Sequence, residues 1–336
     1  MIHEQYRFFG KELVNSSGEF QKENTDRNKP KHLTVLPRYL KLNLWQEERE
    51  NKMEVENCTH QLCSFDQQML KDPQYTSLYS QEIFTYLLTQ EQKYLVSNNY
   101  MNEQQQPDLN TRMRAILLDW LIDVHLKFKL RDETLYVTTY LIDRYLNLKT
   151  TTRQQLQLVG VASLFIACKY EEIYPPDLKD FVYITDNAYT KQDVLEMEGQ
   201  ILQTLDFSIT QPSSYSFLQR FGRIAGLDTK NLFLAQYLLE LSMIDIKFMN
   251  YKPSFLSAAA IYLVHKIRKT PQSWNEEMQK MTGYNEQELR FCAKEMCLVL
   301  QSQDKSNLQA VRKKFGQPKY QEVSRIRVER QIKQQK

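Results

Sequence analysis

The chain has 336 residues, of which 42% are apolar, 25% charged and 12% aromatic, and its formal net charge is +3. This composition allows a large hydrophobic core and excludes a chain that is disordered throughout. The length is typical of two domains, and so small a net charge argues against a protein that coats nucleic acid.

No targeting or membrane-spanning segment is apparent. Residues 1–14 mix charged and apolar side chains and lack the apolar run of a signal peptide. The longest apolar stretch, residues 255–264, is broken by Ser257 and is too short to cross a bilayer. We therefore expect a soluble intracellular protein without a membrane partner.

Motifs for catalysis and metal binding are missing from the sequence. The five cysteines form no Cys-x-x-Cys pair, which suits free thiols in a reducing compartment. Cys58, His60 and Cys63 make a small cluster, but zinc needs a fourth ligand and none follows at a matching spacing. The eight glycines form no phosphate-binding loop, and neither His-Glu-x-x-His nor Gly-x-Ser-x-Gly occurs. We expect no metal, no cofactor and no catalytic residue.

The first 109 residues precede the expected domains. Residues 1–75 are rich in Lys, Glu, Asn and Gln without a sustained hydrophobic period, and we interpret them as a mostly disordered regulatory tail. Residues 76–109 hold an N-terminal helix and a polar linker. The helix, over residues 79–95, places apolar side chains at helical spacing, among them Ile83, Tyr86 and Leu87.

Residues 110–210 predict a set of five helices. Asn110 can cap the first helix and Asp132 the second. Two capping boxes, Thr151 with Gln154 and Thr190 with Asp193, precede two more helices. The pair Pro175-Pro176 separates these two and can open a further helix between them.

A second set of helices is expected in residues 211–318, followed by a basic tail over residues 319–336. Its helices are predicted at 214–225, 228–249, 252–269, 273–281 and 285–300, with a last stretch at 307–315. Ser273 with Glu276 forms a capping box for the fourth. The third helix of each set is rich in small residues, which let neighbours approach closely, so we expect these two helices to be central.

The first helix of the first set has an unusually wide apolar face. At about 100° per residue, Met113, Ile116 and Trp120 lie on one side of it. Further apolar side chains beside them widen the arc to roughly 140°, against the ~100° that a surface helix needs for its own core; they are Leu117, Leu121, Val124 and Phe128. Asp123 lies at the edge of this arc, so the helix is suited to bind another molecule.

Several long motifs resemble the cyclin box, and more closely the A/B-type (mitotic) cyclins. They are Met-Arg-Ala-Ile-Leu-Leu-Asp-Trp-Leu (113–121), Leu-Ile-Asp-Arg-Tyr-Leu (141–146), Leu-Gln-Leu-Val-Gly (156–160), Ala-Cys-Lys-Tyr-Glu-Glu-Ile-Tyr-Pro-Pro (167–176) and Phe-Val-Tyr-Ile-Thr-Asp (181–186). Tyr-Lys-Pro-Ser (251–254) and Thr-Gly-Tyr (282–284) are similar to the second cyclin fold. The resemblance implies an all-α protein with two tandem five-helix cyclin folds, preceded by an N-terminal helix.

The resemblance also implies a function. Such a protein is a non-catalytic regulatory subunit that binds and activates a cyclin-dependent serine/threonine kinase, controls G2/M progression and works in the nucleus and cytoplasm. Lys169 and Glu198 correspond to the family's basic and acidic pair at the kinase interface. Four further positions correspond to its apolar contacts with the kinase: Tyr170, Phe207, Ile83 and Tyr86.

A second surface is implied for substrates and inhibitors that carry Arg-x-Leu motifs. The family's hydrophobic docking patch corresponds here to Met113, Ile116, Leu117, Trp120, Leu156 and Gln157. Asp123 stands where the family carries an acidic residue for the arginine of the motif, and it is one methylene shorter than the common Glu. In the tail, Lys22, Glu23 and Asn24 resemble the KEN signal read by the anaphase-promoting complex, although no Arg-x-x-Leu destruction box precedes the fold.

Two other functions remain as alternatives. A cyclin-fold adaptor in transcription would bind nucleic acid or polymerase machinery, and it should carry an N-terminal zinc ribbon and a strongly basic face. The incomplete Cys58 cluster and the net charge argue against it. An enzyme is the other alternative. Asp143-Arg144 resembles a kinase catalytic loop, but the glycine-rich loop and Asp-Phe-Gly are missing, so we expect a structural pair between helices.

Overall fold

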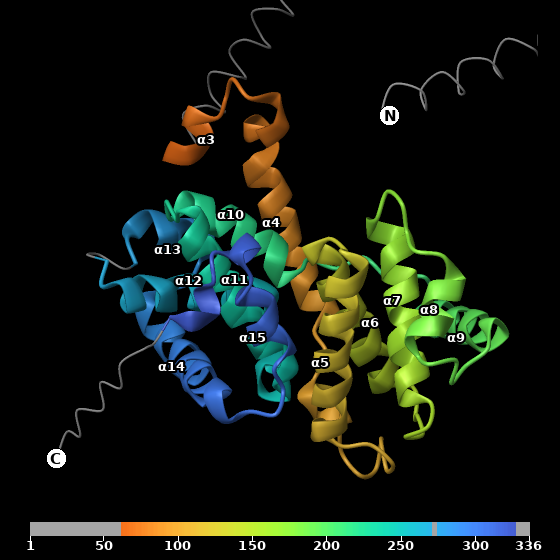
Figure 1. Ribbon diagram of the computed structural model, residues 1–336. Coiled ribbons are helices and arrows are strands. Elements are labelled where there is room, and N and C mark those ends of the chain that lie inside the picture. Colours follow the sequence, from red (N-terminus) through yellow and green to blue (C-terminus); the bar gives the residue numbers. More distant parts are fainter. Residues whose placement is uncertain (1–61, 271–273, 327–336) are drawn as a thin grey trace, which may run out of the picture. The chain divides into compact units, whose positions relative to one another are not determined.

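The computed structural model of the chain describes residues 62–270 and 274–326. All regular structure in these ranges is helical, which confirms the all-α prediction (Figure 1). Two short elements come first, α3 (Ser64–Gln68) and α4 (Ser80–Gln90), and a 3-10 turn over Glu91–Tyr94 follows α4. Among the described residues, every helix is too short or too polar to cross a membrane.

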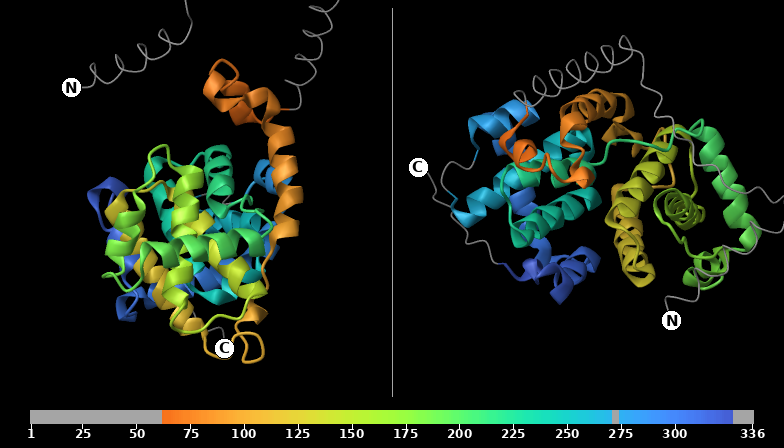
Figure 2. Two further views of the ribbon diagram at one scale, coloured as in Figure 1. Left: turned by 90° about the vertical axis from the view of Figure 1, so that its right-hand side faces the viewer. Right: turned by 90° about the horizontal axis from the view of Figure 1, so that it is seen from above.

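Two sets of five helices follow, as expected. The first consists of α5 (Thr111–Phe128), α6 (Asp132–Leu148), α7 (Leu156–Glu171), α8 (Leu178–Ile184) and α9 (Lys191–Thr204). The second consists of α10 (Ser214–Ile224), α11 (Thr229–Ile244), α12 (Pro253–Arg268), α13 (Glu276–Thr282) and α14 (Glu286–Ser302), after which comes α15 (Ala310–Phe315). Seen from above, the yellow to green helices form one bundle and the teal to blue helices the other (Figure 2).

The two helices rich in small residues are central, as predicted. Helix α7 packs against α5, α6, α8 and α9, and α12 packs against α10, α11, α13 and α14. Every residue of α7 from Leu158 to Cys168 is buried, which is the pattern of a helix surrounded by others. A Cβ on Gly160 would lie only 2.8 Å from Leu117 Cδ1, so this glycine permits the close contact of α7 with α5.

Buried charged groups connect the two bundles. Arg114 on α5 forms two hydrogen bonds with Asp143 on α6, at 2.6 and 2.7 Å, and Tyr100 donates a third to the same carboxylate. Arg114 Nη1 also donates to the carbonyl oxygens of Met243 and Ile244 on α11. Asp143 is therefore structural, as expected, but its ion-pair partner is Arg114 and not the adjacent arginine.

A second buried charge lies between the bundles near α15. The Lys314 ammonium has no exposed surface and lies 2.6 Å from Glu240 Oε1 on α11 and 3.2 Å from Asp132 Oδ1 at the start of α6. Burial alone would lower the pKa of Lys314, but the two carboxylates reverse the direction and raise it. The ammonium is therefore charged and links elements of both bundles.

The capping predictions had mixed outcomes. Asn110 caps α5 and Thr190 forms a capping box with Asp193 at α9, as predicted. Asp132 is the first residue of α6 and not its cap. The Thr151 capping box is wrong because α7 begins only at Leu156, and the Thr151 amide instead donates to the Gln106 side chain.

The cap of α13 is also corrected. Asn275 and not Ser273 caps this helix, since its side chain accepts a hydrogen bond from the Met278 amide at 2.9 Å. Ser273 itself lies outside the described residues. Asn285 forms an unpredicted capping box with Glu288 at α14.

Both tails predicted from the sequence include residues that the structure assigns to the fold. Residues 62–75 were assigned to the N-terminal tail, yet they contain α3 and a 3-10 turn over Pro73–Tyr75. Residues 319–326 were assigned to the basic tail, yet Tyr320 and Val323 are buried and the Tyr320 ring lies 4.8 Å from that of Phe315. A few buried side chains, such as Asp66 and Tyr320, hold these segments, and they leave no periodic hydrophobic pattern in a polar sequence.

Candidate functional site

The predicted acidic and basic pair is formed in the structure. Lys169 lies in the last turn of α7 and makes an ion pair with Glu198 on α9, 29 positions later in the chain. The Lys169 side chain is 44% exposed and that of Glu198 11%. The Lys169 ammonium also lies 4.2 Å from the centre of the Phe165 ring, a favourable cation–π geometry. Both contacts fix this cation in one place at the surface.

Tyr170 directly follows Lys169 in α7, and Phe207 lies in the segment after α9. The Tyr170 hydroxyl is 2.6 Å from Thr210 Oγ1, which connects the end of α7 to the segment after α9. Phe207 has a φ of +54°, and Asp206 before it has a φ of +49°. The left-handed region costs a non-glycine residue roughly 1–2 kcal/mol, yet the Phe207 side chain stays 68% exposed. The left-handed pair ends α9, because the amides of Asp206 and Phe207 donate to the carbonyl oxygens of Gln203 and Leu202. This turn leaves the Phe207 ring at the surface.

The loop after α7 adds two exposed apolar residues that sequence reasoning missed. Ile173 is 81% exposed and Tyr174 is 91% exposed, directly before the proline pair. Exposed apolar side chains gathered in one place mark sites of interaction with other molecules. The only signal in the sequence was two large apolar residues outside any helical period. We name the kinase-facing candidates Lys169, Glu198, Tyr170, Phe207, Ile173 and Tyr174 the α7–α9 face.

Helix α4 presents the other two predicted positions. Ile83 is 43% exposed and Tyr86 is 61% exposed. The opposite side of α4 packs against the core of the second bundle through Phe84, Leu87 and Leu88. Ile83 and Tyr86 thus belong to a different element from the α7–α9 face.

The predicted docking patch is assembled from α5 and the start of α7. Ile116 is 51% exposed, while Leu117 and Leu156 are only 5% exposed and belong to the core. The other three members, Met113, Trp120 and Gln157, are half-buried. Leu117 and Leu156 therefore lie beneath the patch. One side of the wide apolar arc of α5 is therefore buried in the core, and Ile116 on the other side is at the surface.

Two carboxylates on α5 have different roles. Asp119 accepts a hydrogen bond from the Ala310 amide at 2.9 Å, at the start of α15. Burial raises the pKa of Asp119, and this hydrogen bond offsets part of the shift. Asp123, one turn after Trp120, is exposed, and its position at the edge of the patch stays a prediction.

Other predicted residues cannot be placed. Lys22, Glu23 and Asn24, together with Cys58 and His60, lie outside the described residues. Cys63 caps α3. Within residues 62–270 and 274–326 no group of three or more His, Cys, Asp or Glu side chains could hold a metal ion.

These features define a class: an all-α scaffold of two joined bundles with exposed apolar and charged side chains at a fixed face. Residues 82–210 match the family model "Cyclin, N-terminal domain", and residues 212–329 match "Cyclin, C-terminal domain". The second match extends beyond residue 318, the predicted end of the second domain.

Relatives agree with this class. A G2/mitotic-specific cyclin-B of Marthasterias glacialis is 41% identical over 261 residues, which are 78% of this chain and 66% of that protein. A G2/mitotic-specific cyclin-B2 of Oryzias latipes is 40% identical over 263 residues, 78% of this chain and 67% of that one. A viral cyclin from herpesvirus saimiri has a TM-score of 0.56 at 18% identity, covering 65% of this chain and 94% of its own, which supports the fold alone. The chain belongs to the cyclin family.

Proposed function

We propose that this chain is the regulatory subunit of a cyclin-dependent serine/threonine kinase, which it binds and activates at the G2/M transition without a catalytic residue of its own. The observation that carries the proposal is the α7–α9 face, which combines the Lys169–Glu198 ion pair with an exposed Phe207 on left-handed backbone directly after α9. The mitotic names of the relatives support the stage of the cell cycle.

The exposed apolar side chains of this face are large enough for their burial to drive a conformational switch in a partner. Phe207, Ile173 and Tyr174 are 68, 81 and 91% exposed. Burying a side chain of this size contributes about 1.5–3 kcal/mol, so three together reach about 5–9 kcal/mol before the cost of association. A nearly complete switch between two states of a partner needs about 5.5 kcal/mol of differential binding. The two quantities are of the same order.

The mechanism follows from what a protein kinase requires. Its active state depends on an ion pair between a lysine and a glutamate of the mobile αC helix. A partner that binds only the conformation with αC in place shifts the population toward that state. Lys169 and Tyr170 end a helix that is buried along most of its length, so the chain offers αC a rigid surface.

Substrate recruitment uses the separate patch on α5. Ile116, Met113 and Trp120 provide apolar surface for the leucine of an Arg-x-Leu motif. Asp123, exposed on the same helix, provides the charge for the arginine. Such motifs are expected in substrates and inhibitors of the complex. Recognition of Lys22-Glu23-Asn24 by the anaphase-promoting complex, and a location in nucleus and cytoplasm, belong to the same proposal.

The direct test is reconstitution with a purified cyclin-dependent kinase. The wild-type chain should bind the kinase and raise its histone-phosphorylating activity, and Lys169→Ala should reduce both by at least tenfold. Lys179→Ala is the matched control, because Lys179 is an exposed lysine of the same bundle that pairs with Asp177 at the start of α8. No binding to any cyclin-dependent kinase, or equal losses in the two variants, would contradict the proposal.

A further inference from the structure

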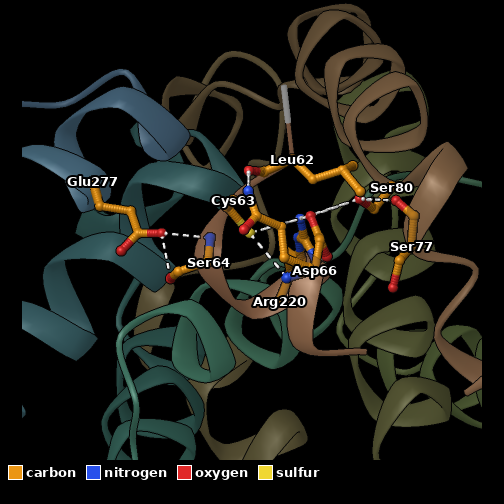
Figure 3. A network of polar contacts seen from close by, with 9 residues as sticks. Leu62, Cys63, Ser64, Asp66, Ser77, Ser80, Arg220 and Glu277 are labelled. Atoms are coloured by element: carbon orange, nitrogen blue, oxygen red, sulfur yellow. Dashed lines mark hydrogen bonds and ion pairs between the residues drawn. The ribbon is translucent and has the colours of Figure 1, made fainter. Parts of the chain in front are cut away.

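A buried polar network attaches the segment before α4 to the second bundle (Figure 3). Asp66 on α3 is 2% exposed and Arg220 on α10 is 8% exposed. The two Arg220 terminal nitrogens each donate to one carboxylate oxygen of Asp66, a two-pronged pairing across 154 positions of sequence. Two-pronged arginine–carboxylate pairs fix orientation as well as distance.

The same carboxylate reaches the beginning of α4. Ser80, the first residue of α4, is buried, and its hydroxyl lies 2.8 Å from Asp66 Oδ2. The Arg220 guanidinium also lies 5.2 Å from the ring of Phe84, one turn further along α4. Asp66 therefore joins α3, α4 and α10 at one point.

Two weaker contacts complete the attachment of α3. The Cys63 side chain caps this helix and donates to Asp66 at 3.1 Å. The amide and hydroxyl of Ser64 donate to Glu277 Oε1 on α13, at 3.1 and 2.7 Å. A helix of five residues has no stability of its own, so these contacts determine where α3 lies. We call this unit, α3 bound to Arg220 and Glu277, the α3 clasp.

Helix α4 is held at its far end as well. Glu91, which directly follows α4, is 2% exposed and accepts hydrogen bonds from the amide and hydroxyl of Ser254 at the start of α12, at 2.9 and 2.7 Å. Between the two attachments, α4 exposes Ile83 and Tyr86, and Tyr79 is exposed directly before the helix; the spacings of four and three residues place them on one side. The attachments therefore fix the direction in which this apolar stripe faces.

We propose that the α3 clasp positions α4 for the partner kinase, with Asp66 and Arg220 as the positioning pair. This inference rests on the proposed function, in which Ile83 and Tyr86 contact the kinase. Breaking a buried pair by removing one partner is costly, because the other charge is left without compensation. Loss of Asp66 should therefore release the start of α4 while the second bundle keeps its core.

The test compares Asp66→Asn with Asp72→Asn in the full chain. Asp72 lies in the same segment, outside the network, where it caps the 3-10 turn over Pro73–Tyr75. Amide hydrogen exchange is measured first. Asp66→Asn should accelerate exchange across residues 64–90 at least tenfold and leave α11 and α12 unchanged. Asp72→Asn should leave α4 unchanged.

Binding to a purified cyclin-dependent kinase is measured on the same proteins. Asp66→Asn should weaken binding about tenfold, since the apparent affinity falls with the fraction of chains that hold α4 in place. Ile83→Ala should weaken binding of the wild-type chain but cause little further loss when added to Asp66→Asn. Glu277→Gln, at the exposed side of the clasp, should act in the same direction by a few fold even if Asp66→Asn folds poorly.

The outcomes separate this inference from the proposed function. If the wild-type chain binds no kinase, the proposed function fails. If the wild-type chain binds and Asp66→Asn binds equally well, the clasp does not position α4 and the inference is overturned. Unchanged exchange of α4 in both Asp66→Asn and Glu277→Gln would overturn it as well.

Discussion

Replacing Asp143 by asparagine should destabilise the chain strongly. Asp143 accepts two hydrogen bonds from Arg114 and one from Tyr100, and Arg114 is only 1% exposed. A buried charge that loses its partner costs about 3–5 kcal/mol. Asparagine keeps one acceptor oxygen, so we expect the lower end, about 3 kcal/mol. At roughly 2–4 °C per kcal/mol for a protein of this size, the melting temperature should fall by about 10 °C.

Tyr100→Phe separates the neutral hydrogen bond from the charge pair. It removes one buried hydrogen bond and should cost about 1 kcal/mol. The double variant should lose less than the sum of the two single variants, because both act on one carboxylate. Asp177→Asn, which breaks an exposed pair with Lys179, is the control and should not change the melting temperature measurably.

Scanning calorimetry and circular dichroism on the four variants provide the measurement. A melting temperature of Asp143→Asn within about 2 °C of the wild type would refute the reasoning. Equal losses of stability in Asp143→Asn and Tyr100→Phe would refute it too. The ion pair with Arg114 would then add nothing to the hydrogen bond from Tyr100.

Further predictions concern the two binding surfaces and the pH dependence. Phe207→Gly should raise the free energy of unfolding by about 1 kcal/mol, since it relieves left-handed strain, while it weakens kinase binding at least tenfold; a loss of stability would contradict this. Ile116→Ala should weaken binding of an Arg-x-Leu peptide several fold in a titration and leave kinase affinity unchanged, and a parallel loss of both would count against separate surfaces. Burial lowers the pKa of His125 to about 4, so the unfolded chain takes up this proton first and stability is lost as the pH falls from 6.5 toward 4. Burial raises the pKa of Glu133 to about 7, so its contribution is lost as the pH rises from 4.5 to 7. Each contribution is roughly 3 kcal/mol over its window and they oppose each other, so Glu133→Gln should reveal a steep rise of stability with pH in denaturant titrations, and an unchanged profile would show that Glu133 has no raised pKa.

Local signals in the sequence were sufficient for much of the fold. Asn110 and the Thr190 capping box were predicted correctly because caps involve residues only a few positions apart. The same pattern failed at Thr151, whose amide is taken by Gln106, 45 positions earlier. A tertiary hydrogen bond of this kind overrides a local motif, and the sequence around Thr151 contains no signal that predicts it.

The site shows the same limit. Spacing alone could place Lys169 and Glu198 only on two different helices, and the resemblance to cyclins was needed to pair them. The left-handed backbone at Phe207 has no sequence signal, since a bulky aromatic residue is not typical of that conformation, although Asp206 before it is of a type enriched there. Asp66 and Arg220 were missed because their pairing spans 154 positions and lies in a segment without hydrophobic period.

The central claim is that a preformed face at the ends of α7 and α9 holds the kinase in its active conformation. Amide hydrogen exchange of the kinase–cyclin complex, read on both partners, tests it most directly. Protection should appear at residues 169–174 and 205–210 and in the kinase αC helix, and it should be lost when Glu198→Gln is mixed with the kinase at the same concentrations. Protection that falls instead on α14, around the exposed Phe291 and Leu298, with residues 169–174 unchanged, would contradict the account.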